Sequence, residues 1–187
     1  MIPVNIAQVI KEAISDDRLD LHVALPGRIQ KVNSDKSLDV VICVKRLIPK
    51  QGGFTEEEYP VLKGIKLAVW RTKKCFIWAP PEKGDEGLVV FVESSISQWF
   101  AEGTIEIPED PGRHTLSNGI FIPCLTTDSE TSALSPQKNG LVVGYKDGAY
   151  VAVENDGTIT AENNAGDFTL KASGQFSVNG GNLTVDP

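Results

Sequence analysis

Acidic and imidazole side chains are the first residues of this chain that could carry out chemistry. Glu56, Glu57 and Glu58 are consecutive, and paired carboxylates are the groups that hydrolyse glycosidic bonds. Such a run in a polar loop is, however, typical of a solvated surface. His114 follows Arg113 and could act as a general base, but the sequence places no nucleophile or orienting acid beside it. We therefore interpret His114 as a structural histidine.

Other catalytic signals are weak. The sequence contains no G-x-S-x-G, H-E-x-x-H, G-x-x-x-x-G-K-[ST] or G-x-G-x-x-G motif. Cys43, Cys75 and Cys124 are widely separated, odd in number and without a C-x-x-C spacing, which predicts reduced, buried thiols. His22 alternates with Leu21 and Val23 and reads as a strand side chain. The sequence therefore predicts a protein that is not an enzyme, with no catalytic residue, metal ligand or cofactor.

The segment WRTKKCFIW has the composition of a nucleic-acid contact. Its aromatic side chains could stack on bases while its basic ones neutralise phosphates; these residues are Trp70, Phe76, Trp78, Arg71, Lys73 and Lys74. The net charge of −7 argues against this hypothesis, because nucleic-acid footprints are usually basic and clustered. The same segment also reads as two strands joined by a basic turn. We predict no nucleic-acid partner and keep a nucleic-acid-binding barrel as a rival hypothesis.

Composition indicates a folded protein with one medium domain, or a small domain and an appendage. Hydrophobic residues make up 41% and charged residues 23% of the 187 positions, which are ordinary globular values. The N-terminus lacks the basic region and the continuous apolar run of a signal peptide. No stretch approaches the roughly 20 apolar residues of a membrane helix. We expect synthesis in a cytoplasm.

Short apolar segments organise the first two thirds of the chain. Residues 1–19 show helical apolar spacing, and residues 20–125 hold five or six strands without helix-length connections, which favours a small barrel such as the OB type. The predicted strands are LHVALPGRIQKV, broken at Pro26-Gly27, then SLDVVICVKRLI, VLKGIKLAVW, CFIWAP, LVVFVESS and RHTLSNGIFIPCL. Between them we predict a polar loop in PKQGGFTEEEYP, a tight turn in PEKGDEG and a helical turn in ISQWFAEG.

Residues 126–139 read as a polar linker, and residues 140–187 contain a repeat. Candidate strands at 149–154, 158–162, 167–172, 175–179 and 182–186 are separated by turns rich in Gly, Asn and Asp. Their apolar residues recur every seven to nine positions, which is typical of a β-helix or solenoid. The residues predicted to share one apolar face are Val151, Val153, Ile159, Ala161, Phe168, Leu170, Phe176, Val178, Leu183 and Val185. Polar residues occupy the opposite, solvated face.

This repeat buries too little as a single chain. Burial of an apolar side chain contributes about 1.5–3 kcal/mol. With only two of every eight residues buried, this gain cannot offset the entropy lost when the backbone of all eight residues is ordered. Several copies of the chain could wind around a common axis, with strands of different chains alternating along it. The other copies would then cover the apolar face that a single chain leaves exposed. Three copies are favoured because Val, Ile, Leu and Phe fill a triangular interior. The predicted fold is all-β: a barrel with a short N-terminal helix, then an intertwined, triple-stranded β-helix. A hairpin meander on the barrel is the alternative.

The order of these parts resembles the central spike of contractile-tail baseplates in bacteriophages, in the branch of membrane-puncturing spikes without a lysozyme domain. The likeness is carried by LPGRIQKV, PPEKGDEGLVVFVESSISQWF and RHTLSNGIFIPCL, followed by the repeat. It implies an OB-fold domain that docks on the tail hub and a homotrimeric needle that pierces the host outer membrane. The implied location is the virion baseplate, and the implied partners are hub and baseplate proteins, a tip-capping protein and, transiently, the host outer membrane.

One feature departs from this resemblance. Many such spikes hold an iron ion at the tip through His-x-His pairs, whereas His22 and His114 lie far upstream. A tip metal would require residues that this sequence lacks. At about 4.8 Å per strand, five strands advance about 24 Å, which is shorter than a bilayer and favours a missing or separate tip. A receptor-binding fibre is the runner-up, although only Tyr145 and Tyr150 offer aromatic contacts near the repeat.

Overall fold

The computed structural model describes residues 6–19, 21–50, 52–105, 107–108, 110–128, 139–145 and 148–178. The chain divides into two compact units, Met1–Leu125 and Thr126–Pro187. Both units are built mainly of β-strands, which confirms the predicted all-β class. The helices among the described residues are α1 (Ile6–Leu19) and α2 (Ser97–Glu102), and neither is long and apolar enough to cross a membrane.

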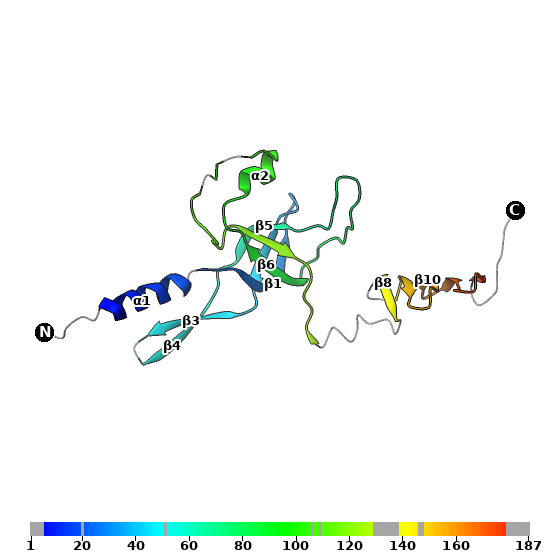
Figure 1. The fold of residues 1–187 in the computed structure, drawn as a ribbon, viewed down its shortest axis with the longest axis horizontal. Coiled ribbons are helices and arrows are strands. Elements are labelled where there is room, and N and C mark those ends of the chain that lie inside the picture. Colours follow the sequence, from blue (N-terminus) through cyan, green and yellow to red (C-terminus); the bar gives the residue numbers. More distant parts are fainter. Residues whose placement is uncertain are drawn as a thin grey trace. The chain divides into compact units, whose positions relative to one another are not determined.

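A closed five-stranded barrel forms the centre of the first unit (Figure 1). Its strands follow one another around the barrel in the order β1, β2, β5, β7 and β6. Their bounds are Ala24–Val32 for β1, Leu38–Ile42 for β2, Leu62–Leu67 for β5, Gly119–Ile122 for β7 and Glu86–Phe91 for β6. The β5–β7 pair is parallel and the other pairs are antiparallel. A small closed barrel of five strands is consistent with the predicted OB-like fold.

Alternation of apolar and polar residues explains why these strands close. In β2, Leu38, Val40 and Ile42 are buried while Asp39 and Val41 are partly exposed, as the period of two along a strand requires. Burial alternates in the same way along β6, and buried side chains from all five strands fill the interior of the barrel. The buried apolar core consists of Ile29, Leu38, Val40, Ile42, Leu62, Ile65, Val89, Phe91 and Phe121.

Glycines in three of the sequence motifs allow the barrel walls to approach each other. A Cβ atom at Gly27 would lie 2.7 Å from Cγ1 of Val40, and one at Gly119 would lie 2.9 Å from Cγ1 of Val89. A Cβ atom at Gly87 would collide with the carbonyl oxygen of Ile122. The motif glycines are therefore required by close packing in the narrow interior.

The predictions for the first two strands of this unit were wrong. Strand β1 is continuous through Pro26 and Gly27, and its irregularity lies instead where the register against β2 shifts between Ile29 and Lys31. The predicted long strand SLDVVICVKRLI ends at Ile42, because the chain bends and leaves the barrel. It then forms β3 (Lys45–Lys50), which pairs with β4 (Gly53–Glu58) in the stretch predicted to be a polar loop.

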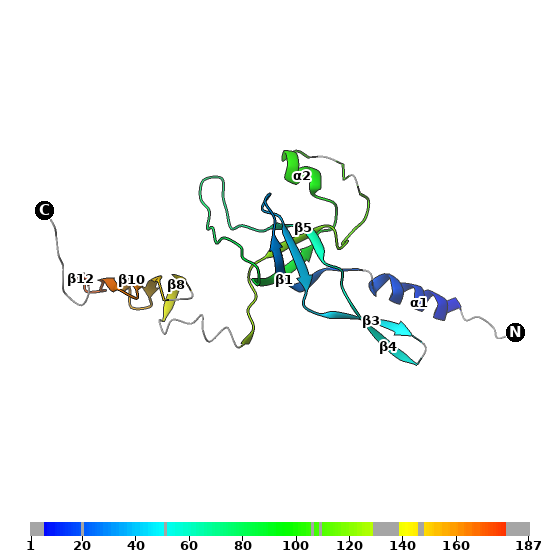
Figure 2. The same cartoon turned by 180° about the vertical axis from the view of Figure 1, so that it is seen from behind.

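The β3–β4 hairpin extends beyond the barrel in both views (Figures 1 and 2). None of its twelve residues is buried. Lys45 Nζ lies 3.0 Å from Oε2 of Glu56, and Arg46 pairs with Glu57 at 2.5 Å. The hydrogen bond that Lys45 donates to the carboxylate of Glu56 raises the pKa of Lys45 above its ordinary value.

Other predictions in this unit have mixed outcomes. The tight turn in PEKGDEG is confirmed, since the backbone N–H of Glu82 donates to Oδ2 of Asp85 at 2.7 Å. The helical turn in ISQWFAEG is confirmed as α2. The segment CFIWAP, predicted to be a strand, makes only an isolated bridge, in which Phe76 lies opposite Arg71. The helix predicted near the N-terminus is confirmed as α1.

The second unit contains a five-stranded antiparallel sheet in which consecutive strands pair, in the order β8 to β12. The bounds are Gly140–Gly144 for β8, Tyr150–Glu154 for β9, Ile159–Asn163 for β10, Gly166–Leu170 for β11 and Phe176–Val178 for β12. Four predicted strands are confirmed, β8 was not predicted, and the candidate at 182–186 lies outside the described residues. This intrachain pairing is a meander and differs from the alternation of strands from different chains that the sequence suggested.

Candidate functional site

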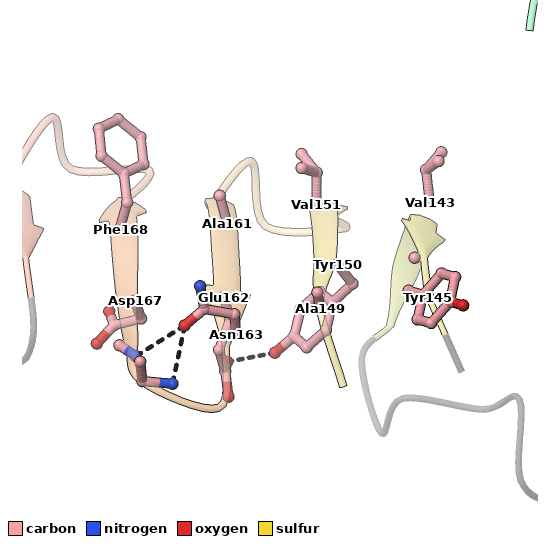
Figure 3. A pocket seen from close by; sticks show the side chains of 13 residues that line it. Val143, Tyr145, Ala149, Tyr150, Val151, Ala161, Glu162, Asn163, Asp167 and Phe168 are labelled. Atoms are coloured by element: carbon pink, nitrogen blue, oxygen red, sulfur yellow. Dashed lines mark hydrogen bonds between the residues drawn. The ribbon is translucent and has the colours of Figure 1, made fainter. Parts of the chain in front are cut away.

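Two rows of apolar side chains cross all five strands of the meander on the same face. Cross-strand register places the members of each row directly opposite one another. The first row consists of Leu141, Val153, Ile159, Leu170 and Phe176. The second row consists of Val143, Val151, Ala161, Phe168 and Val178. We refer to these ten residues as the apolar face. Figure 3 shows that Val143, Val151, Ala161 and Phe168 project to one side of four successive strands.

The apolar face is open in the single chain. Leu141 is 69% exposed and Phe176 47%, whereas Phe121 in the barrel core is fully buried. Ala161 and Val178 are partly covered and the other members are exposed. A contiguous apolar surface of this kind marks an interaction site in a soluble protein.

The structure brings together the face residues that the sequence predicted, as far as it describes them. Eight of them are members of the apolar face, and Leu183 and Val185 lie outside the described residues. Sequence reasoning missed Leu141 and Val143. The segment GLVVG contains three apolar residues in succession, so its alternation does not show which side chains share a face. The glycines at either end of GLVVG are the signal that could have marked it as a strand.

The opposite face is less solvated than the sequence predicted. Ala152 and Thr160 are buried at its centre, because the longer side chains of the flanking rows cover these short ones. Polar side chains form bonds across this face: the hydroxyl of Tyr150 donates to Glu162, and the hydroxyl of Thr160 lies 3.4 Å from Oε1 of Glu154. The expectation of a wholly solvated second face was therefore wrong.

Side chains in the turns fix the order of the strands. Oδ1 of Asp156 accepts the backbone N–H of Thr158 at 2.8 Å in the β9–β10 turn, where Gly157 has a φ of 88°. In the β10–β11 turn, Oδ1 of Asn163 accepts the N–H of Ala165 at 2.8 Å and of Gly166 at 3.0 Å (Figure 3). Asx turns of this kind close tight connections between antiparallel neighbours.

The residues considered for catalysis are not brought together. Glu56 and Glu57 pair with basic residues on the neighbouring strand, and all three consecutive glutamates are exposed, as predicted for a solvated surface. His114 is partly buried, and its Nδ1 lies 3.1 Å from the carbonyl oxygen of Phe91, which confirms the structural interpretation. No cluster of three or more His, Cys, Asp or Glu suited to a metal ion occurs among the described residues.

Two further sequence predictions need correction. Cys43, Cys75 and Cys124 are free thiols, but all three are exposed rather than buried. His22 precedes β1 instead of lying in a strand, and its ring packs edge-on against Tyr59 with the centroids 5.5 Å apart. Short apolar sequence around a residue predicts a strand, but it does not show whether that strand is covered.

The barrel carries the likeness to known proteins. The family described as phage protein Gp138 N-terminal domain matches residues 25–124, which begin in β1 and end just after β7. A comparison with curated proteins finds no match. The matched residues contain all five barrel strands with their three closely packed glycines, and they make up more than half of the sequence. The chain is therefore a phage protein that belongs to the Gp138 N-terminal domain family.

Proposed function

We propose that this phage protein is the central spike of a tail baseplate and that it acts as a homotrimer. The observation that carries the proposal is the apolar face, whose two continuous rows stay open in the single chain. Each large apolar side chain gains about 1.5–3 kcal/mol on full burial, so the nine large members of the face provide a strong drive to associate. Identical copies of the meander offer a matching surface.

The intrachain ladders suggest how three copies would meet. Each meander would form one wall of a three-walled prism, with its apolar face inward and its hydrogen-bonded polar face outward. This arrangement keeps the ladders from β8 to β12 within each chain. It replaces the intertwined winding expected from the sequence and needs no strand exchange. The dry interior and the continuous ladders would give the needle its stiffness.

The proposed mechanism is mechanical. Sheath contraction supplies the work, the barrel attaches the needle to the tail hub and other baseplate proteins, and the needle transmits force to the host outer membrane. A separate protein would cap the tip. No step of this mechanism uses a catalytic residue, a cofactor or a nucleic acid. The polar outer wall, with Glu154, Glu162 and Asp167, would limit sticking to anionic lipids.

Light scattering on the full-length chain tests the proposal. The expected mass is about three times 20.2 kDa. A mass of one or two chains would contradict it, because a pair of meanders could bury the same face as a two-layered sandwich. Negative-stain electron microscopy should show a narrow rod beside a wider body. Particles without a rod would contradict the proposed needle.

A receptor-binding fibre is the second candidate, and one observation favours it. A hollow of about 780 Å³ at the sheet is lined by Tyr145 and Tyr150, by the polar residues Glu162, Asn163 and Asp167, and by part of the apolar face (Figure 3). The ring of Tyr150 lies beside Glu162, to which its hydroxyl donates. Aromatic rings beside carboxylates and amides are suited to sugar hydroxyls. Binding to surface glycans that disappears in Tyr145→Ala, with the mass unchanged, would favour this candidate over the spike.

A further inference from the structure

Two loops of the barrel unit expose apolar side chains and carry opposite charge. The first is residues 70–78, here called the basic hairpin, which contain Arg71, Lys73 and Lys74 and no acidic residue. The second is residues 93–112, here called the acidic loop, which include α2. The sequence of this loop contains five acidic residues and no Lys or Arg. Elsewhere in this unit acidic and basic residues are interspersed, so these two loops differ from their surroundings in carrying charge of a single sign.

The basic hairpin has a defined shape that presents aromatic side chains. The N–H of Ile77 donates to the carbonyl of Trp70 at 2.9 Å, and the N–H of Thr72 donates to the carbonyl of Cys75 at 2.7 Å. Around this frame Trp70, Phe76 and Trp78 are all exposed, and Phe76 is the most open at 71%. Exposed aromatic side chains next to basic ones are enriched at interfaces, where they act as anchors.

The acidic loop offers a receiving surface. A hollow of about 280 Å³ lies beside α2 and is lined by residues before, within and after this helix. Ile96, Trp99, Ile105 and Ile107 form its apolar part, and serine, glutamine and threonine side chains complete the lining. An apolar cavity of about 150 Å³ accommodates benzene, so this hollow has room for one aromatic side chain. Glu102 lies at the end of α2 and is exposed, and Asp110 is an exposed acid further along the loop.

We propose that the basic hairpin of one copy docks into the hollow of the acidic loop of the next copy, with Phe76 as the anchor. Charge complementarity selects this occupant, because Lys73 and Lys74 would approach Glu102 and Asp110 while the aromatic ring fills the hollow. Both loops belong to every copy. The contact therefore joins two different patches, and repetition around an axis closes a ring.

Only the number of copies in this ring rests on the proposed function, which sets it at three. The contact differs from the apolar face in every residue. It would join the barrels of neighbouring copies, whereas the apolar face joins the meanders. A trimer held by two independent interfaces resists dissociation when force acts on one of them.

Cross-linking through Cys75 tests the contact, since this thiol is free, exposed and lies in the turn of the basic hairpin. The variant combines Cys43→Ser, Cys124→Ser and Ser94→Cys, which places the second thiol at the hollow. A short bismaleimide bonds one thiol at each end. Denaturing gels should show covalent dimers and trimers and nothing larger.

The control carries Lys63→Cys, at an exposed position of β5, in place of Ser94→Cys and should give background cross-linking. A trimeric mass without cross-links above this background overturns the docking contact and leaves the proposed spike intact. Cross-linked ladders beyond three chains overturn the closed ring. A monomeric mass contradicts the proposed function. In that case the cross-linking yield, compared with that of the control, still tests the docking contact.

Charge reversal provides the specificity test. Lys73→Glu with Lys74→Glu should lower the cross-linking yield about tenfold, as should Glu102→Lys with Asp110→Lys. All four changes together should restore it, and failure to do so overturns the charge pairing. The rival occupant is single-stranded nucleic acid. If a labelled oligonucleotide binds at low salt and the lysine reversals abolish this binding while cross-linking stays at background, the hairpin is a nucleic-acid surface and the proposal is wrong.

Discussion

Phe168 and Phe176 lie on neighbouring strands of the meander with their ring centroids 4.8 Å apart and their planes at 77°. Despite this edge-to-face contact, Phe168 is 45% exposed and Phe176 47%. The two rings thus form an apolar centre that one chain does not cover. Aromatic pairs of this kind gain about 0.5–1.5 kcal/mol beyond burial, and further apolar surface must cover them for the hydrophobic gain to be complete.

The first prediction concerns this pair. Phe176→Asp should convert the proposed trimer into monomers, because three copies would bring three carboxylates into an apolar interior. The barrel should stay folded, since it is a separate compact unit with its own core. Light scattering measures the mass, and near-ultraviolet circular dichroism reports the barrel.

The matched control is Ser177→Asp. Ser177 follows directly in β12 and lies on the polar face, opposite Thr169. This variant should keep the mass of the unchanged chain. A trimeric Phe176→Asp chain would show that Phe176 is not inside an assembly, and loss of the trimer in both variants would point to general damage of β12.

A second prediction concerns the narrow barrel. Gly87→Ala should lower the free energy of unfolding by about 1–3 kcal/mol, because the new Cβ atom collides with the carbonyl of Ile122 and lies 2.6 Å from Cζ of Phe121. Thermal unfolding measures the effect. Lys31→Ala, an exposed change in β1, should leave the melting temperature within error. Equal stability of both variants would mean that the barrel wall relaxes freely.

The third prediction concerns the β3–β4 hairpin. A two-stranded hairpin without buried residues is marginally stable, and its exposed ion pairs add little because solvent screens them. Backbone amides of Leu47 and Ile48 should therefore exchange with solvent much faster than those of Val40 and Val89 in the barrel. Hydrogen exchange with mass spectrometry measures the difference. Equal protection would mean that another surface covers the hairpin.

The fourth prediction concerns the turn between β1 and β2. A hydrogen bond from the hydroxyl of Ser37 lowers the pKa of Asp35 below its ordinary value of 3.8, and one from the amide of Asn33 does the same for Asp39. Each ionised carboxylate thus stabilises the folded state above that value, and this contribution disappears as the pH falls through the lower folded pKa.

Carbon chemical shifts of the two carboxyl groups should accordingly titrate with midpoints below 3.8. Asn33→Ala should move the Asp39 midpoint upward, because it removes the amide that bonds Oδ1 of Asp39 at 3.0 Å. The Asp35 midpoint, which depends on Ser37, should change less. Midpoints at or above 3.8 in the unchanged chain would show that these hydrogen bonds do not persist in solution.

Much of the fold could be predicted from the sequence where local pattern and tertiary packing agree. The continuous apolar run in LVVFVESS predicted β6. The eight-residue period of the repeat predicted strands β9 to β12, because one face of each of these strands carries its apolar side chains. The turn residues of the repeat, such as Asn163 and Gly157, were equally readable, since their geometry depends on their own side chains and backbone.

Predictions failed where one continuous apolar stretch contributes to two different sheets. Nothing local in SLDVVICVKRLI shows that Ile42 belongs to the barrel while Lys45 starts a separate hairpin, because both halves have the same β propensity. Cys43, at that bend, looked buried for the same reason and is exposed. Burial is a property of what lies opposite a residue, and the sequence does not contain that relationship.

By itself, the sequence determined that this protein is all-β and that a barrel precedes a short-period repeat. It also determined that the apolar residues of each repeat strand occupy alternate positions and therefore lie on one face. The tertiary structure alone decided the barrel order β1, β2, β5, β7 and β6, the pairing of consecutive strands in the meander, and the openness of the apolar face. The physical reason is that alternation is encoded within each strand, whereas pairing and coverage depend on residues far apart in the chain.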